Sequence, residues 1–91
     1  MAQSGQETVD GAGTAQRIAA NQPGKVFVIR ALPDNTGTVY VGNDGADDVS
    51  ATTGFPLGTS DAFLVVELDN LNQLWVDAAT NDDGVAWFVL A

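Results

Sequence analysis

The sequence predicts an all-β fold, a small antiparallel β-sandwich or barrel with a flexible N-terminal arm. Segments rich in β-branched and aromatic residues recur at short intervals, and clusters of Gly, Asn, Asp and Pro separate them. No segment shows the apolar repeat that is typical of an amphipathic helix. We therefore expect a flexible arm at residues 1–14 and a single β-domain at residues 15–91.

The arm, residues 1–14, consists mainly of Gln, Ser, Gly, Ala and Thr, with Val9 as its one apolar β-former. Such a composition buries too little apolar surface to offset the entropy lost on ordering. Two interpretations stay open. The arm is either a disordered start without a role, or a segment that orders on a partner, for example by adding a strand to a sheet edge with Val9 as the anchor. Residues 14–20 that follow are expected to form a short edge strand.

The clearest signal is a pair of segments, residues 25–32 and 38–42, which flank a run of turn formers. We expect two antiparallel strands joined by this turn, with the first strand ending before Pro33, which has no N–H to donate. Alternation places Phe27 on one face of the first strand and Val28 on the other, with apolar neighbours on both faces. Such a strand is usually covered on both sides, by a second sheet or by a neighbouring subunit.

The segment Phe55-Pro56-Leu57 lies between two glycines after a long polar loop. A short apolar cluster in this position either closes one end of the core or contacts a partner, and both interpretations stay open. Phe55 precedes a proline and should therefore be extended.

Three more strands are expected at residues 61–68, 73–78 and 85–91, with turn-forming residues between them. The last of them is apolar on both faces. A domain of this size has a small core of its own, so we expect a homo-oligomer in which sister subunits cover the remaining apolar surface.

The charge balance excludes several classes of partner. The 91 residues include 12 acidic and 3 basic side chains, for a net charge of −9. Nucleic acids and anionic membranes would repel such a chain. No apolar run is long enough to span a bilayer.

The sequence has no histidine and no cysteine, which removes the commonest general base, the commonest metal ligand and all thiolate chemistry. The aspartate pairs at 47–48 and 82–83 lie in glycine-rich turns, where solvated carboxylates are usual. Calcium is the best inorganic alternative, at 43–48 and 81–84, but neither turn has the full ligand set of an EF-hand loop. We expect no catalytic residue, no cofactor site, no metal site and no enzymatic activity.

Three aromatic residues, Tyr40, Trp75 and Trp87, lie within predicted strands. A platform that stacks on sugar rings is conceivable for them. Packing in the core or at an interface explains their positions more simply.

One stretch resembles a known family. The run IRALPDNTGTVYVG at residues 29–42, the GFPLG at 54–58 and the LWVDAA at 74–79 are similar to small structural proteins of tailed bacteriophages. The greatest similarity is to capsid decoration, or cement, proteins, and it covers residues 24–91. These motifs are structural rather than catalytic.

The resemblance implies a virion protein on the outer capsid surface. Such a protein would form a homotrimer, bind the major capsid protein and stabilise the capsid by bridging neighbouring subunits. The partner-contact candidates are then Val9, Phe55, Pro56 and Leu57. The alternative is a tail or fibre β-module that binds a host-surface glycan or another virion protein.

Overall fold

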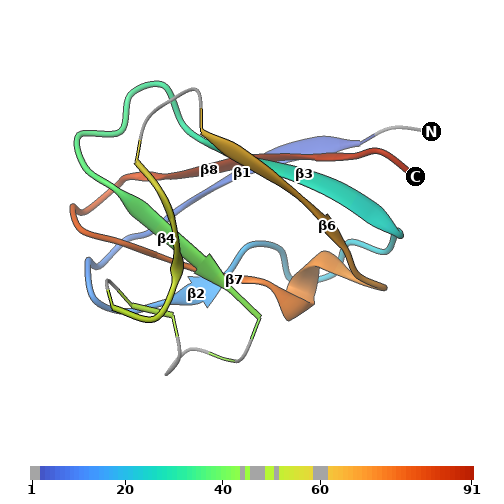
Figure 1. The fold of residues 1–91 in the computed structure, drawn as a ribbon, viewed down its shortest axis with the longest axis horizontal. Coiled ribbons are helices and arrows are strands. Elements are labelled where there is room, and N and C mark those ends of the chain that lie inside the picture. The colour runs from blue at the N-terminus through green and yellow to red at the C-terminus, as the bar shows by residue number, and fades with distance from the viewer. Residues whose placement is uncertain (1–2, 44, 46–48, 51, 59–61) are drawn as a thin grey trace.

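The computed structural model describes residues 3–43, 45, 49–50, 52–58 and 62–91, which form two antiparallel four-stranded sheets packed face to face (Figure 1). The first sheet contains, in spatial order, β1 (Ser4–Thr8), β8 (Gly84–Val89), β3 (Val26–Ala31) and β6 (Phe63–Glu67). The second contains β2 (Gln16–Arg17), β7 (Trp75–Ala78), β4 (Val39–Gly42) and β5 (Phe55–Leu57). A short 3-10 helix, η2 (Leu71–Gln73), precedes β7. The predicted all-β sandwich is confirmed.

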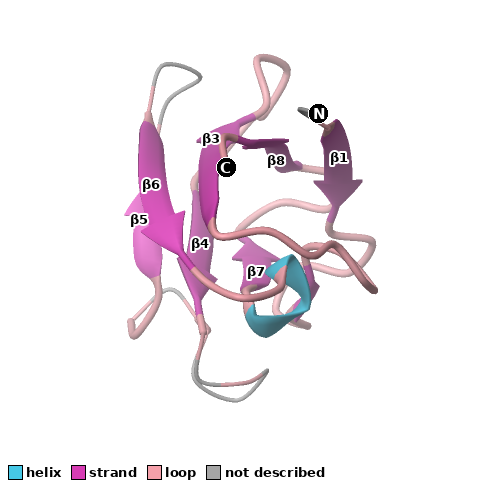
Figure 2. Ribbon diagram, turned by 90° about the vertical axis from the view of Figure 1, so that its right-hand side faces the viewer, coloured by secondary structure: helices cyan, strands magenta, loops and turns pink. Residues whose placement is uncertain are grey.

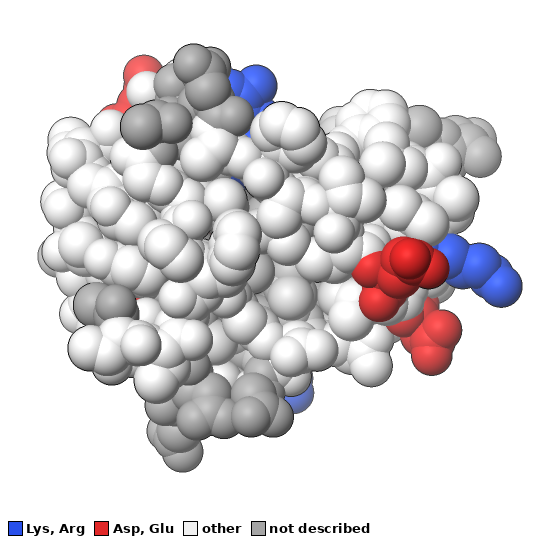
Figure 3. Space-filling view, viewed as in Figure 1, with Lys and Arg blue, Asp and Glu red and all other residues white. Residues whose placement is uncertain are grey.

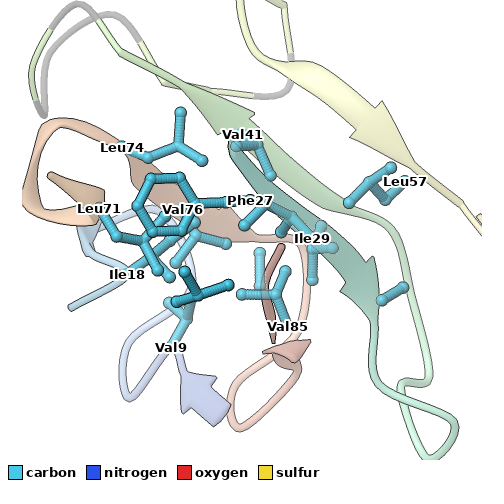
Figure 4. Close-up of a cluster of buried hydrophobic side chains, with 14 residues drawn as sticks. Val9, Ile18, Phe27, Ile29, Val41, Leu57, Leu71, Leu74, Val76 and Val85 are labelled. Atoms are coloured by element: carbon cyan, nitrogen blue, oxygen red, sulfur yellow. The ribbon is translucent and has the colours of Figure 1, made fainter. Parts of the chain in front are cut away.

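The core lies between the two sheets, as the end-on view in Figure 2 and the close-up in Figure 4 show. Alternation along β3 sends Phe27 and Ile29 inward, where both are fully buried, and the second sheet supplies Val41 and Val76 from the opposite side. Each of these side chains contributes about 1.5–3 kcal/mol through the apolar surface that it removes from water.

The predicted pairing of 25–32 with 38–42 is wrong, although both strands exist. β3 pairs with β6 and β8, whereas β4 pairs with β5 and β7, so the chain crosses from one sheet to the other after Pro33. The physical reason is that both strands have an apolar inner set. Phe27 and Ile29 of β3 and Val39 and Val41 of β4 are all buried, and strands in opposite sheets can bury these sets against each other.

The prediction of a flexible arm is also corrected, because Ser4–Thr8 form an edge strand whose five residues pair with β8. The polar composition of this segment is compatible with an edge position, since the backbone ladder does not depend on apolar side chains. Val9 is 0% exposed and lies in the core, and its N–H donates to the Asp83 carbonyl at 2.8 Å. Val9 is therefore a core residue and not a partner anchor.

A buried carboxylate fixes the connection between β3 and β4. Asp83, which is 4% exposed, accepts hydrogen bonds from the N–H groups of Thr36, at 3.0 and 3.1 Å, and Gly37, at 2.8 Å. Beside it, the Asn35 side chain bonds to both backbone groups of Gly84, at 2.9 Å each. Side chains thus satisfy the backbone where the chain leaves the first sheet.

Candidate functional site

The outer side of the first sheet carries large apolar side chains that face water. Because inward and outward positions alternate, burying Phe27 and Ile29 turns Val28 outward on β3. On β6 the same alternation turns Phe63 and Val65 outward, and they are 63% and 54% exposed.

Register brings these side chains together in two rows across the sheet. Phe88, Val28 and Val65 form one cross-strand row, and Ala86, Arg30 and Phe63 form the next. Phe88 is 42% exposed despite its neighbours. We call the set Val28, Phe63, Val65, Ala86 and Phe88 the outer apolar face. Contiguous apolar surface of this kind is a usual mark of an interaction site.

The outer apolar face is hollowed. A groove of about 510 Å³ runs over it, and its lining includes Ser4, Gln6, Val28, Phe63, Ala86 and Phe88. Ala86 has a small side chain beside Phe88 on β8, which lowers the surface there. A partner side chain could fill this groove and remove the neighbouring rings from water.

The outer apolar face carries one charged side chain, because Arg30 lies between Ala86 and Phe63 in the second row and also lines the groove. Figure 3 faces the side of the sandwich on which the edge strands β6 and β5 lie; much of the described surface there is uncharged, with a cluster of acidic and basic side chains at the right-hand end and smaller charged groups at the top and bottom. A depression at the end of β6 is lined by Lys25, Glu67 and Asp69, among others. An apolar surface that combines exposed Phe side chains with one Arg is compatible with a protein interface, because aromatic residues and Arg are enriched at such interfaces.

The structure divides the Phe55-Pro56-Leu57 segment between the two interpretations given above. The segment is edge strand β5, paired with β4, rather than a loop tip. Leu57 is 1% exposed and belongs to the core, whereas Phe55 is 57% exposed and Pro56 also faces solvent. Core packing therefore applies to Leu57, and a partner contact stays a prediction for Phe55 and Pro56.

This division gives a stability test. Leu57→Ala should cost about 2–4 kcal/mol of unfolding free energy because it opens a cavity in the core. Phe55→Ala should cost less than about 1 kcal/mol because the side chain is already 57% exposed in the folded state. Urea denaturation of the two variants measures the difference, and equal losses would contradict the division.

The buried carboxylates have structural partners. Asp83 binds backbone N–H groups as described, and Asp77 accepts from Gly13 at 3.0 Å and from its neighbour Ala78 at 2.8 Å. In the turn that also contains Asp83, the Asn81 side chain accepts a hydrogen bond from the N–H of Ala12 at 2.7 Å. Within the described residues, no group of three or more Asp, Glu, His or Cys side chains is placed to hold a metal ion. Most of the other acidic turn, 44 and 46–48, lies outside the described residues.

The tryptophans have packing partners. The Arg17 guanidinium lies 4.9 Å from the centre of the Trp75 ring, and Trp87 packs against the core beneath β1. A Cβ at Gly5 would come within 2.5 Å of the Trp87 ring, so the glycine makes room for it. These contacts favour packing over a sugar-binding platform.

The search for similar proteins adds nothing to this geometry, since the sequence matches no family model and no curated protein. Among the described residues, no helix has the length and apolar character needed to cross a bilayer. The outer apolar face was not among the predicted site residues. Its only signal in the sequence was that several strands are apolar on both sides.

Proposed function

We propose that the protein is a virion structural protein that decorates and stabilises a bacteriophage capsid by bridging major capsid subunits. The observation that carries this proposal is the outer apolar face, where large hydrophobic side chains lie in water beside a groove. The resemblance of residues 24–91 to capsid decoration proteins supplies the identity of the partner. The activity is binding, and it needs no catalytic group.

The size of the surface suits such binding. A standard interface takes about 800 Å² from each partner, roughly a sixth of the 5011 Å² that this chain exposes. There is thus room for a contact with the capsid and another with sister subunits. A homotrimer on the capsid would also hold several weak contacts together, which raises the overall affinity without stronger individual contacts.

The test is co-sedimentation with capsids assembled from the major capsid protein of the same phage. We expect the wild-type protein to bind at about one copy per capsid subunit. A tail or fibre module would be present in few copies and would leave these capsids bare. Absence of binding to the capsids would contradict the proposal.

The contact can be located with the double variant Phe63→Gln, Phe88→Gln. Two anchors are removed from the centre of the outer apolar face, so capsid affinity should fall by about a hundredfold, or about 2.8 kcal/mol. The melting temperature should change by no more than a few degrees, because Phe63 is 63% exposed and Phe88 is 42% exposed in the free protein. The matched control is Phe55→Gln on the second sheet. Loss of binding in the control alone would place the contact at β5 instead.

A further inference from the structure

The four edge strands of the sandwich differ in how well they are protected against pairing with another chain. β1 is polar and contains Gly5 and Glu7, β2 has two residues, and β5 has three residues with Pro56 at its centre. These are features that block strand addition. β6 has five residues, apolar at its first four positions, without Pro or Gly.

The ladder shows which backbone groups of β6 are left for another strand. Ala31 donates to the Ala62 carbonyl at 3.2 Å, and Leu68 donates to the Lys25 carbonyl at 3.1 Å. Because hydrogen-bonded positions alternate in an antiparallel pair, even-numbered residues of β6 bond to β3. The N–H and C=O groups of Phe63, Val65 and Glu67 therefore point to the free edge. The same three residues are exposed.

We propose that β6 accepts an extended segment of a partner protein as a fifth strand of the first sheet. The added strand would place alternate side chains beside Phe63 and Val65, which extends the outer apolar face. A Lys or Arg of the partner would lie at the Glu67 end, where the depression is lined by the two carboxylates of Glu67 and Asp69 and by one basic side chain, Lys25. This inference rests on the proposed function only for the identity of the partner, which would then be a capsid subunit.

Charge decides between a partner segment and a second copy of this chain. Two-fold antiparallel pairing of β6 with itself about Val65 would set Phe63 against Glu67 of the other copy. It would also bring together two chains that each carry a net charge of −9. A segment with a basic residue beside Glu67 is attracted to this acidic chain, so charge complementarity favours the partner segment.

The experiment uses hydrogen exchange of the backbone amides with a probe peptide of alternating valine and threonine that has a lysine at each end. Added peptide should slow exchange at Phe63, Val65 and Glu67 by about tenfold or more. A peptide with glutamate at both ends should bind more weakly. Unchanged exchange at these amides would overturn the proposal. If exchange at these amides slows as the protein concentration rises without added peptide, the proposal is also overturned, because a second copy of this chain then covers the edge.

The decisive variant is Val65→Pro, which removes an outward N–H and leaves the bonds between β6 and β3 in place. Peptide affinity should fall by about tenfold or more, whereas Val65→Thr, which keeps the N–H and a branched side chain, should retain most of it. If Val65→Pro does not fold, the valine–threonine peptide with N-methylated backbone groups gives the same test on the wild-type protein. Equal binding of the methylated and unmodified peptides would overturn strand addition.

Capsid binding by these variants separates the two proposals. If wild-type protein binds capsids and Val65→Pro binds equally well, strand addition at β6 is wrong while capsid decoration stands. If wild-type protein fails to bind capsids but the peptide protects β6, the capsid role is wrong while the β6 edge remains a strand-accepting site.

Discussion

Deleting residues 1–9 should lower the unfolding free energy by about 4 kcal/mol, or the melting temperature by roughly 15–30 °C. The deletion removes strand β1, which pairs with β8 along five residues, and it removes Val9 from the core. Burial of one valine contributes about 1.5–3 kcal/mol, and the lost ladder leaves β8 as an unpaired edge. Differential scanning calorimetry measures the change directly.

Two point variants refine this test. Val9→Ala should reproduce about half of the loss, whereas Ser4→Ala, at an exposed position of the same strand, should have almost no effect. A deletion variant that melts within a few degrees of the wild type would show that β1 contributes nothing to the fold.

Asp83→Ala is the second change with a large expected effect, about 2–4 kcal/mol of unfolding free energy. The buried carboxylate accepts the N–H groups of Thr36 and Gly37, and alanine would remove the hydrogen-bond partner of both donors. The connection between β3 and β4 would then loosen at the point where the chain changes sheets.

The controls for this prediction are Asp83→Asn and Asp82→Asn. Asp83→Asn keeps one carbonyl acceptor and should show an intermediate loss. Asp82 is exposed and has a φ of 71°, a conformation that asparagine tolerates, so Asp82→Asn should be nearly neutral. Equal stability of Asp83→Ala and Asp82→Asn in urea denaturation would contradict the structural role of Asp83.

The strands with strong apolar alternation were predictable from the sequence. The predicted segments 25–32, 38–42, 61–68 and 73–78 contain β3, β4, β6 and β7, and the segment 85–91 covers β8 apart from its first residue, Gly84. The inner face of β3 was not decided, since Phe27 and Val28 lie in two equally apolar sets. Only the packing of the second sheet on one side selects Phe27 for the core.

The elements that the sequence concealed are those that depend on distant backbone. β1 has polar side chains, and its pairing with β8 becomes visible only when the two ends of the chain are brought together. β3 and β4 looked like a hairpin because a turn joins them. In the structure this turn carries the chain from one sheet to the other, and it is held by hydrogen bonds of Asn35, within the turn, and of Asp83, which is distant in the sequence. β5 was obscured by Pro56, which is compatible with an edge strand.

The candidate site was foreseen only in general terms. Strands that are apolar on both faces indicate a partner, yet Phe63, Val65 and Phe88 could not be chosen before the register was known. Of the predicted contacts, Val9 and Leu57 lie in the core, and Phe55 and Pro56 are exposed on the other sheet.

The most direct test of the central claim is an electron cryomicroscopy reconstruction of capsids mixed with the protein. The proposed role predicts density on the outer capsid surface in every equivalent position, with Phe63, Val65 and Phe88 of the first sheet against a capsid or sister subunit. Capsids without added density, or a bound protein whose outer apolar face is open to solvent, would contradict it.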